Sequence, residues 1–242
     1  MLPLHDENRP LKRPYVNYAL IVVNVAVFLY LYLQGPEVFE AAILRYGMVP
    51  AYILAGERLY TILTSMFMHA DILHLCGNML YLYIFGDNVE DAFGHAGYLA
   101  FYLACGVGAA FMHLFATLIS RLFMPPNLFA LSIKIPAVGA SGAISGVLGA
   151  YFLLYPRARI RTLVTYYVIT VVSIPAYYYI GFWFVYQLLM GVFALALPVS
   201  VAFWAHVGGF VTGLLLVKAL GVRPPIKKRV FTYYYVPVEP YY

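Results

Sequence analysis

One serine of the sequence lies in a run of small residues, "PAVGASGAIS" (residues 136–145), within an otherwise apolar stretch. A serine hydroxyl is a weak nucleophile until a base takes its proton, and a neutral histidine within hydrogen-bond reach can act as that base. Ser141 and His206, the latter in "AHVGGFVTG" (residues 205–213), could form such a pair. The chemistry would be attack on a carbonyl carbon, giving an acyl-enzyme that water then hydrolyses.

Attack on a carbonyl also requires hydrogen-bond donors for the oxyanion that forms. His74 and Asn78, in "HLCGN", are one helical turn apart, and both can donate from their side chains. Ser141 is predicted near the start of a helix, where backbone N–H groups are unpaired. A catalytic triad would also need an acid, but the sequence has no Asp or Glu in residues 92–238. If the protein is a serine hydrolase, it must therefore work with a serine–histidine dyad, and His74, Asn78 and the backbone N–H of Ser141 could form its oxyanion hole.

The composition predicts an integral membrane protein. Of the 242 residues, 64% are hydrophobic and 10% are charged, which is too apolar for a soluble domain. The length allows about six spans of about 20 residues each. Both cysteines, Cys76 and Cys105, lie in apolar stretches and predict no disulfide framework. Residues 1–14 lack the apolar core of a signal peptide, so we expect the first span to be retained.

Apolar runs indicate where the spans lie. We expect helices at residues 15–33, 72–85, 96–119, 137–155, 175–194 and 201–220. Residues 37–60 mix apolar and charged side chains and predict an amphipathic segment at the membrane interface. We expect "GDNVEDAFGH" (residues 86–95) to be an acidic turn and residues 162–174 to be a surface-lying extended or re-entrant stretch. A seven-span arrangement is the alternative.

The distribution of Lys and Arg favours six spans. If both termini are cytoplasmic, 11 of these residues lie inside and 4 outside, as the positive-inside rule requires. The inner set is Arg9, Lys12, Arg13, Arg157, Arg159, Arg161, Lys218, Arg223, Lys227, Lys228 and Arg229, and the outer set is Arg45, Arg58, Arg121 and Lys134. The predicted fold class is an all-α polytopic membrane protein, a bundle of six transmembrane helices with both termini cytoplasmic.

Glycines flank both reactive residues on their predicted helices. They are Gly142 and Gly146 after the serine, and Gly209 and Gly213 after the histidine. Small residues at this spacing let helix backbones approach closely, so we predict that these glycines pack the two helices together. Such packing would bring His206 toward Ser141. The competing interpretation is that Ser141 is itself only a packing residue.

The candidate residues are also predicted at similar depths in the membrane. His74, Ser141 and His206 each precede the next charged cytoplasmic segment by 13 to 17 residues. At 1.5 Å per residue this is about 20–25 Å of helix. In a hydrocarbon core about 30 Å thick, all three would lie in one layer nearer the outer face. Scattered packing residues are not expected to share a layer.

Other functions fit parts of the sequence. Histidines at positions 69, 74, 95, 113 and 206 suggest a metal site, but His69 and His74 are five residues apart and do not share a helix face. The predicted spans contain no carboxylate, which weakens a metal or proton-coupled transporter. A channel, or a non-catalytic scaffold that binds other membrane proteins, remains compatible with the composition.

Three motifs together are similar to those of a known family. In order and spacing, "GASGAISG", "HLCGN" and "AHVGGFVTG" resemble the GxSG, HxxxN and AHxxGxxxG motifs of the rhomboid intramembrane serine proteases, and the resemblance covers about residues 15–220. It implies that Ser141 is the nucleophile and His206 the base. It also implies that His74 and Asn78 line the oxyanion hole, and that no cofactor or metal is used.

The resemblance is incomplete at two places. Where bacterial members often have a Trp-Arg pair in the first outer loop, this sequence has Tyr60 and Thr61. Four residues after the serine, where a tyrosine often packs on the catalytic histidine, it has Ser145. Some other group must therefore brace His206. His69 matches a family histidine with a structural role, so we do not assign it to catalysis.

Together these features predict a multi-pass protein of the cell membrane that cleaves transmembrane protein substrates near the outer face. Residues 1–14 would be a cytoplasmic segment, residues 15–220 the membrane domain, and residues 221–242 a cytoplasmic basic and Tyr-rich tail. We expect residues 231–242 to lie on the membrane surface. The expected partners are the bilayer and its transmembrane protein substrates, with no nucleic acid or metal. The resemblance implies substrate entry near residues 175–200.

Overall fold

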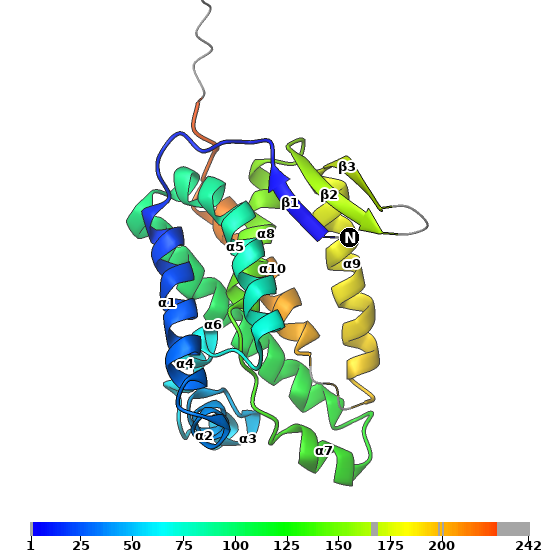
Figure 1. The fold of residues 1–242 in the computed structure, drawn as a ribbon. Coiled ribbons are helices and arrows are strands. Elements are labelled where there is room, and N and C mark those ends of the chain that lie inside the picture. The colour runs from blue at the N-terminus through cyan, green and yellow to red at the C-terminus, as the bar shows by residue number, and fades with distance from the viewer. Residues whose placement is uncertain (1, 166–168, 198, 200, 227–242) are drawn as a thin grey trace, which may run out of the picture.

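The computed structural model describes residues 2–165, 169–197, 199 and 201–226, which form a helical bundle with a small sheet at one end (Figure 1). The expectation for residues 231–242 lies outside these described residues. The helices are α1 (Tyr15–Tyr32), α2 (Pro36–Tyr46), α3 (Pro50–Leu54), α4 (Thr61–Thr64), η1 (Ser65–Phe67), α5 (Ile72–Phe93), α6 (His95–Ser120), α7 (Pro126–Ser132), α8 (Ser141–Leu154), α9 (Ala176–Ala194) and α10 (Phe203–Ala219).

The six predicted apolar runs coincide with α1, α5, α6, α8, α9 and α10. Among the described residues, α1, α6 and α9 are long and apolar enough to cross a membrane, while α8 and α10 are apolar but shorter. The predicted interfacial segment at residues 37–60 contains α2 and α3, which are short helices. The chain is therefore a predominantly helical membrane protein, as its composition predicts.

The prediction of an acidic turn at residues 86–95 is wrong, because α5 continues through this stretch to Phe93. The helix ends at Gly94, which has φ 72°, a conformation that glycine adopts readily and that commonly terminates helices. The acidic side chains do not break the helix, because backbone N–H groups from the N-terminal segment pair with Glu90 and Asp91. Sequence periodicity gives no indication of partners that are more than 70 residues away.

A three-stranded antiparallel sheet among the described residues corrects the all-α expectation. Its order is β1 (Leu2–Asp6), β2 (Arg159–Thr165) and β3 (Ile169–Pro175). The predicted extended stretch at 162–174 is thus part of a β-hairpin rather than a re-entrant segment. Its many β-branched residues favour strands, and β2 alternates buried Ile160 and Thr162 with exposed Arg159 and Arg161.

The connection between α8 and β2 fixes the first turn of α9. The backbone N–H of Ala176 donates to the carbonyl of Ala158 at 2.8 Å, and that of Tyr177 donates to Pro156 at 3.1 Å. The hydroxyls of Tyr179 and Tyr81 are 2.7 Å apart, which links the same end of α9 to α5. The beginning of α9 is therefore anchored to the connection that follows α8.

The core is centred on α8, which packs against α5, α6 and α10. Most residues of α8 are buried, including Val147, Leu148 and Tyr151. Its contact with α10 is made backbone to backbone. A Cβ atom on Gly209 would overlap the carbonyl oxygen of Gly142, and one on Gly213 would overlap that of Gly146. These two pairs set the spacing of the helices that carry Ser141 and His206.

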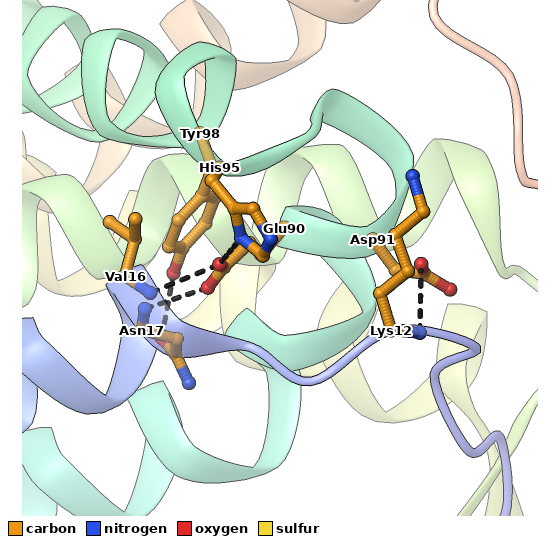
Figure 2. Close-up of polar contacts among 7 residues, drawn as sticks. All are labelled: Lys12, Val16, Asn17, Glu90, Asp91, His95 and Tyr98. Atoms are coloured by element: carbon orange, nitrogen blue, oxygen red, sulfur yellow. Dashed lines mark hydrogen bonds and ion pairs between the residues drawn. The ribbon is translucent and has the colours of Figure 1, made fainter.

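Glu90 holds the N-terminus of α1. Proline precedes α1 and its ring offers no oxygen for capping, but the carboxylate of Glu90 accepts from the N–H groups of Val16 at 3.0 Å and Asn17 at 2.7 Å. Figure 2 shows this carboxylate meeting Nδ1 of His95, while the Tyr98 hydroxyl donates to Asn17 Oδ1 at 2.8 Å. Glu90 is only 1% exposed. A buried carboxylate thus satisfies the N–H groups at the end of another helix.

The neighbouring Asp91 extends this contact. It accepts from the backbone N–H groups of Leu11 at 2.7 Å and Lys12 at 3.3 Å, the latter drawn in Figure 2. The C-terminal turns of α5 therefore organise both the start of α1 and the residues before it.

We expect Glu90→Gln to destabilise the protein by about 1–3 kcal/mol, the cost of leaving buried polar groups poorly paired. Glutamine keeps the size of the side chain but has one acceptor oxygen in place of two, so one N–H of α1 loses its partner. The midpoint of thermal unfolding in detergent measures the effect. Glu40→Gln, on an exposed position of α2, is the control and should leave the midpoint unchanged. Equal midpoints for the two variants would contradict this role of Glu90.

Candidate active site

The structure brings Ser141 and His206 into contact. Nε2 of His206 lies 2.8 Å from Oγ of Ser141. Ser141 is the first residue of α8 and His206 is the fourth residue of α10, so both lie near the starts of helices that run side by side. Gly142 directly follows Ser141 and Gly209 lies one turn after His206, so their close approach holds the two side chains at this distance.

The turn before Ser141 depends on a glycine. Gly139 has φ 123°, a value that side-chain-bearing residues rarely adopt, and its N–H donates to the carbonyl of Ser65 at 2.9 Å. A Cβ atom there would lie 2.7 Å from Nε2 of His74. Gly139 therefore lets the chain pass close to α5 immediately before α8 starts, where the first N–H groups of the helix have no partner within it.

His74 and Asn78 face this turn from α5. Asp71 caps the helix by accepting from the backbone N–H of His74 at 2.8 Å. Both side chains lie beside Gly139, with Nδ2 of Asn78 3.5 Å from the position of a Cβ on that glycine. Nδ2 of Asn78 is buried and has no hydrogen-bond partner among the described residues. A buried donor without a partner is costly, so this arrangement suits an acceptor that arrives with a substrate.

His69 lies next to the candidate donors without joining the dyad. Its ring packs edge-on against His74 with centroids 5.2 Å apart, and it is 1% exposed. Within the described part of the chain, neither of its ring nitrogens has a hydrogen-bond partner. No group of three or more His, Cys, Asp or Glu residues in the described ranges could hold a metal ion.

A small cavity of about 50 Å³ adjoins Ser141. Small side chains such as Ala109 and Ala205 line it, together with Gly142. The space is large enough for water or a small side chain next to the hydroxyl.

Sequence reasoning missed the contact on the other side of His206. Oε1 of Gln187, from α9, lies 2.9 Å from Nδ1 of the histidine, and Gln187 is 4% exposed. The ring of Trp183 lies 6.1 Å from the imidazole, centroid to centroid. Ser145 instead donates to the carbonyl of Ser141 at 2.6 Å. An amide within the apolar stretch 176–194 was the available signal, since a polar side chain in such a helix usually has a partner.

Comparisons with known proteins agree with the motifs. The family model described as "Rhomboid domain" matches residues 56–223. Rhomboid protease GluP of Bacillus subtilis (strain 168) is 26% identical over 210 residues, covering 87% of this chain and 36% of the relative. Rhomboid protein 1, mitochondrial, of Saccharomyces cerevisiae is 31% identical over 144 residues, covering 59% of this chain and 37% of the relative.

A plant relative gives similar values. RHOMBOID-like protein 4 of Arabidopsis thaliana is 31% identical over 179 residues, covering 71% of this chain and 36% of the relative. The matched part thus spans little more than a third of the length of these curated relatives.

Proposed function

Because the chain belongs to the rhomboid family, we propose that it is an intramembrane serine protease that cleaves transmembrane protein substrates, with Ser141 as the nucleophile and His206 as the base. The observation that carries this proposal is the 2.8 Å contact between Nε2 of His206 and Oγ of Ser141. This distance lies within the range needed for direct proton transfer from nucleophile to base.

The reaction proceeds by acyl transfer. Nε2 of His206 takes the hydroxyl proton as Oγ of Ser141 attacks the carbonyl carbon of the scissile bond. The protonated imidazole then gives this proton to the departing amine, which leaves an acyl-enzyme on the serine. A water molecule, deprotonated by the same nitrogen, hydrolyses the ester and restores the dyad.

Three donors are suitable for the oxyanion. They are the backbone N–H of Ser141 and the side chains of His74 and Asn78, which lie beside the turn that ends at the nucleophile. Nδ2 of Asn78 supports this role most directly, since it is buried and lacks a partner in the described residues. Its hydrogen bond would form only when negative charge develops on the carbonyl oxygen.

We expect Asn78→Ala to lower kcat about 100-fold with little change in KM, because the lost donor acts in the transition state. Asn78→Asp should be at least as damaging, since a carboxylate of the same shape repels the oxyanion. Steady-state cleavage of a single-span substrate in detergent measures both. Asn127→Ala, on the exposed surface of α7, is the control. A kcat for Asn78→Ala close to that of the control would remove Asn78 from the oxyanion hole.

We propose six membrane spans formed by α1, α5, α6, α8, α9 and α10, with both termini cytoplasmic. The N-terminal strand β1 and the C-terminal end of α10 lie at the same end of the bundle, which supports an even number of spans (Figure 1). The excess of Lys and Arg at that end supports its cytoplasmic location. Within this scheme residues 1–14 and 221–242 are cytoplasmic, residues 15–220 form the membrane domain, and the membrane is the cell membrane.

A fluorophosphonate probe tests the proposal. The purified, detergent-solubilised protein should be labelled at Ser141, because the probe reacts with serines that a base activates. The labelled protein should also lose cleavage of a model single-span substrate reconstituted in liposomes. A folded protein that neither reacts with the probe nor cleaves such a substrate would contradict the proposal and favour a non-catalytic membrane-protein-binding scaffold.

A further inference from the structure

His206 makes a second contact, through Nδ1, that takes no part in the proton transfers described above. Its Nε2 faces Ser141, and its Nδ1 lies 2.9 Å from Oε1 of Gln187. We propose that Gln187 is the positioning residue of the dyad, fixing both the tautomer and the orientation of His206. This inference rests on the proposed protease function, because it assigns to Gln187 the part that a carboxylate has in a catalytic triad.

The chemistry of the amide decides the tautomer. An amide oxygen can only accept a hydrogen bond, so Nδ1 of His206 must carry the proton. In the neutral ring Nε2 is then an acceptor, and it can receive the proton of the Ser141 hydroxyl. The opposite tautomer would present an N–H to the serine and could not act as a base. Gln187 thus selects the one neutral form of the ring that is chemically competent.

The surroundings leave few alternatives for this role. The sequence has no Asp or Glu in residues 92–238, and Gln187 itself is 4% exposed. In the part of the chain that the structure describes, the titratable groups close enough to act on His206 electrostatically are His74 on α5 and His113 on α6. A neutral acceptor avoids placing a carboxylate in this apolar setting, where a charge would be costly.

Packing around Gln187 holds its amide against the histidine. The indole N–H of Trp204 donates to the carbonyl of Gly191 at 2.8 Å, one turn beyond Gln187 on α9. One turn before it, the ring of Phe184 stacks on Phe210 with centroids 4.2 Å apart. These contacts on either side seat α9 on α10 at the level of the dyad. The position of Oε1 therefore follows from helix packing, not from a flexible side chain alone.

Two substitutions separate positioning from packing. Gln187→Met keeps the length of the side chain but removes the acceptor, so we expect kcat to fall about 10–100-fold while KM stays within about twofold. Gln187→Glu restores an acceptor, so it should recover most of the activity. Its carboxylate would stabilise the protonated ring, moving the acidic limb of the kcat/KM profile to higher pH. Gln34→Met, at an exposed glutamine, is the matched control.

The tautomer can be measured without catalysis. In protein labelled with ¹⁵N-histidine, the signals of His206, assigned by their loss in His206→Ala, should show a proton on Nδ1 in the wild type. Gln187→Met should shift the ring toward a mixture of tautomers. The thermal unfolding midpoint of each variant is measured in parallel, so that a loss of stability is not mistaken for a change of tautomer.

The outcomes distinguish the two claims. Lower kcat in Gln187→Met, recovery in Gln187→Glu and a changed tautomer support the positioning role. If the wild type cleaves while Gln187→Met keeps its kcat, pH profile and tautomer, the positioning role is overturned and the protease function stands. If the wild type neither cleaves nor reacts with a fluorophosphonate, the protease function fails, and the tautomer measurement alone decides whether Gln187 orients the ring.

Discussion

Ser141→Ala and His206→Ala are each expected to reduce the rate of cleavage by at least about 10³-fold, and the double variant should be no worse than either single one. The two side chains act as one unit. The hydroxyl is a poor nucleophile without the imidazole, and without the hydroxyl the imidazole has no nucleophile to deprotonate. Single-turnover cleavage of a single-span substrate in liposomes measures the chemical step directly. The residual rate should stay above that of the uncatalysed reaction, because the oxyanion donors and the substrate-binding surface are unchanged.

Ser145→Ala is the matched control for these variants. Ser145 is buried, lies one turn further along α8, and its hydroxyl donates to the carbonyl of Ser141. It should retain activity within a few-fold, because the hydroxyl does not meet the histidine. If the Ser141→Ala protein cleaves as fast as Ser145→Ala, then Ser141 is only a packing residue and not the nucleophile.

Gly213→Ala is expected to destabilise the fold by about 3 kcal/mol, at the upper end of the usual cost of overpacking. The added methyl group would meet the carbonyl of Gly146, and backbone atoms cannot rotate away as a side chain can. The helices must separate, so the Ser141–His206 contact should lengthen and activity should fall even in the folded fraction. Unfolding in detergent and fluorophosphonate reactivity report the two effects separately.

Gly77→Ala provides the comparison within a helix. Gly77 lies on α5, and nothing lies within 4 Å of the position of its Cβ. Alanine there should increase stability by about 0.5–1 kcal/mol, since glycine is the poorer helix former. If Gly213→Ala proves as benign as Gly77→Ala, then the approach of α8 and α10 does not depend on the absence of a side chain.

The parts of the fold and site that could be predicted are those specified by local pattern. Apolar runs located the long helices, and the small-residue spacing around Ser141 and His206 predicted that α8 and α10 pack together. The structure places the two side chains in contact at 2.8 Å, and it places His74 and Asn78 beside the same turn. Their roles in catalysis stay predictions.

The missed features depend on partners that are distant in the sequence. In the sequence Glu90 is typical of a polar turn. Its role is evident only in the structure, where its carboxylate oxygens accept from the backbone N–H groups at the start of α1. Strand β1 has little pattern of its own and forms because β2 supplies its hydrogen bonds. Gln187 has no motif, and only the packing of α9 on α10 reveals that its amide faces His206.

The anchoring of the N-terminal end of α9 to the connection between α8 and β2 has a mechanical consequence. Hydrogen bonds at Ala176 and Tyr177 make this end of the helix a fixed point, and Gln187 lies eleven residues, or about 16 Å, along the axis from it. A tilt of about ten degrees about that point would displace the amide by about 3 Å, enough to break a hydrogen bond. The helix would thus pivot about the connection between α8 and β2. A force that moved the other end of α9 away from α10 would separate Gln187 from His206 without displacing Ser141.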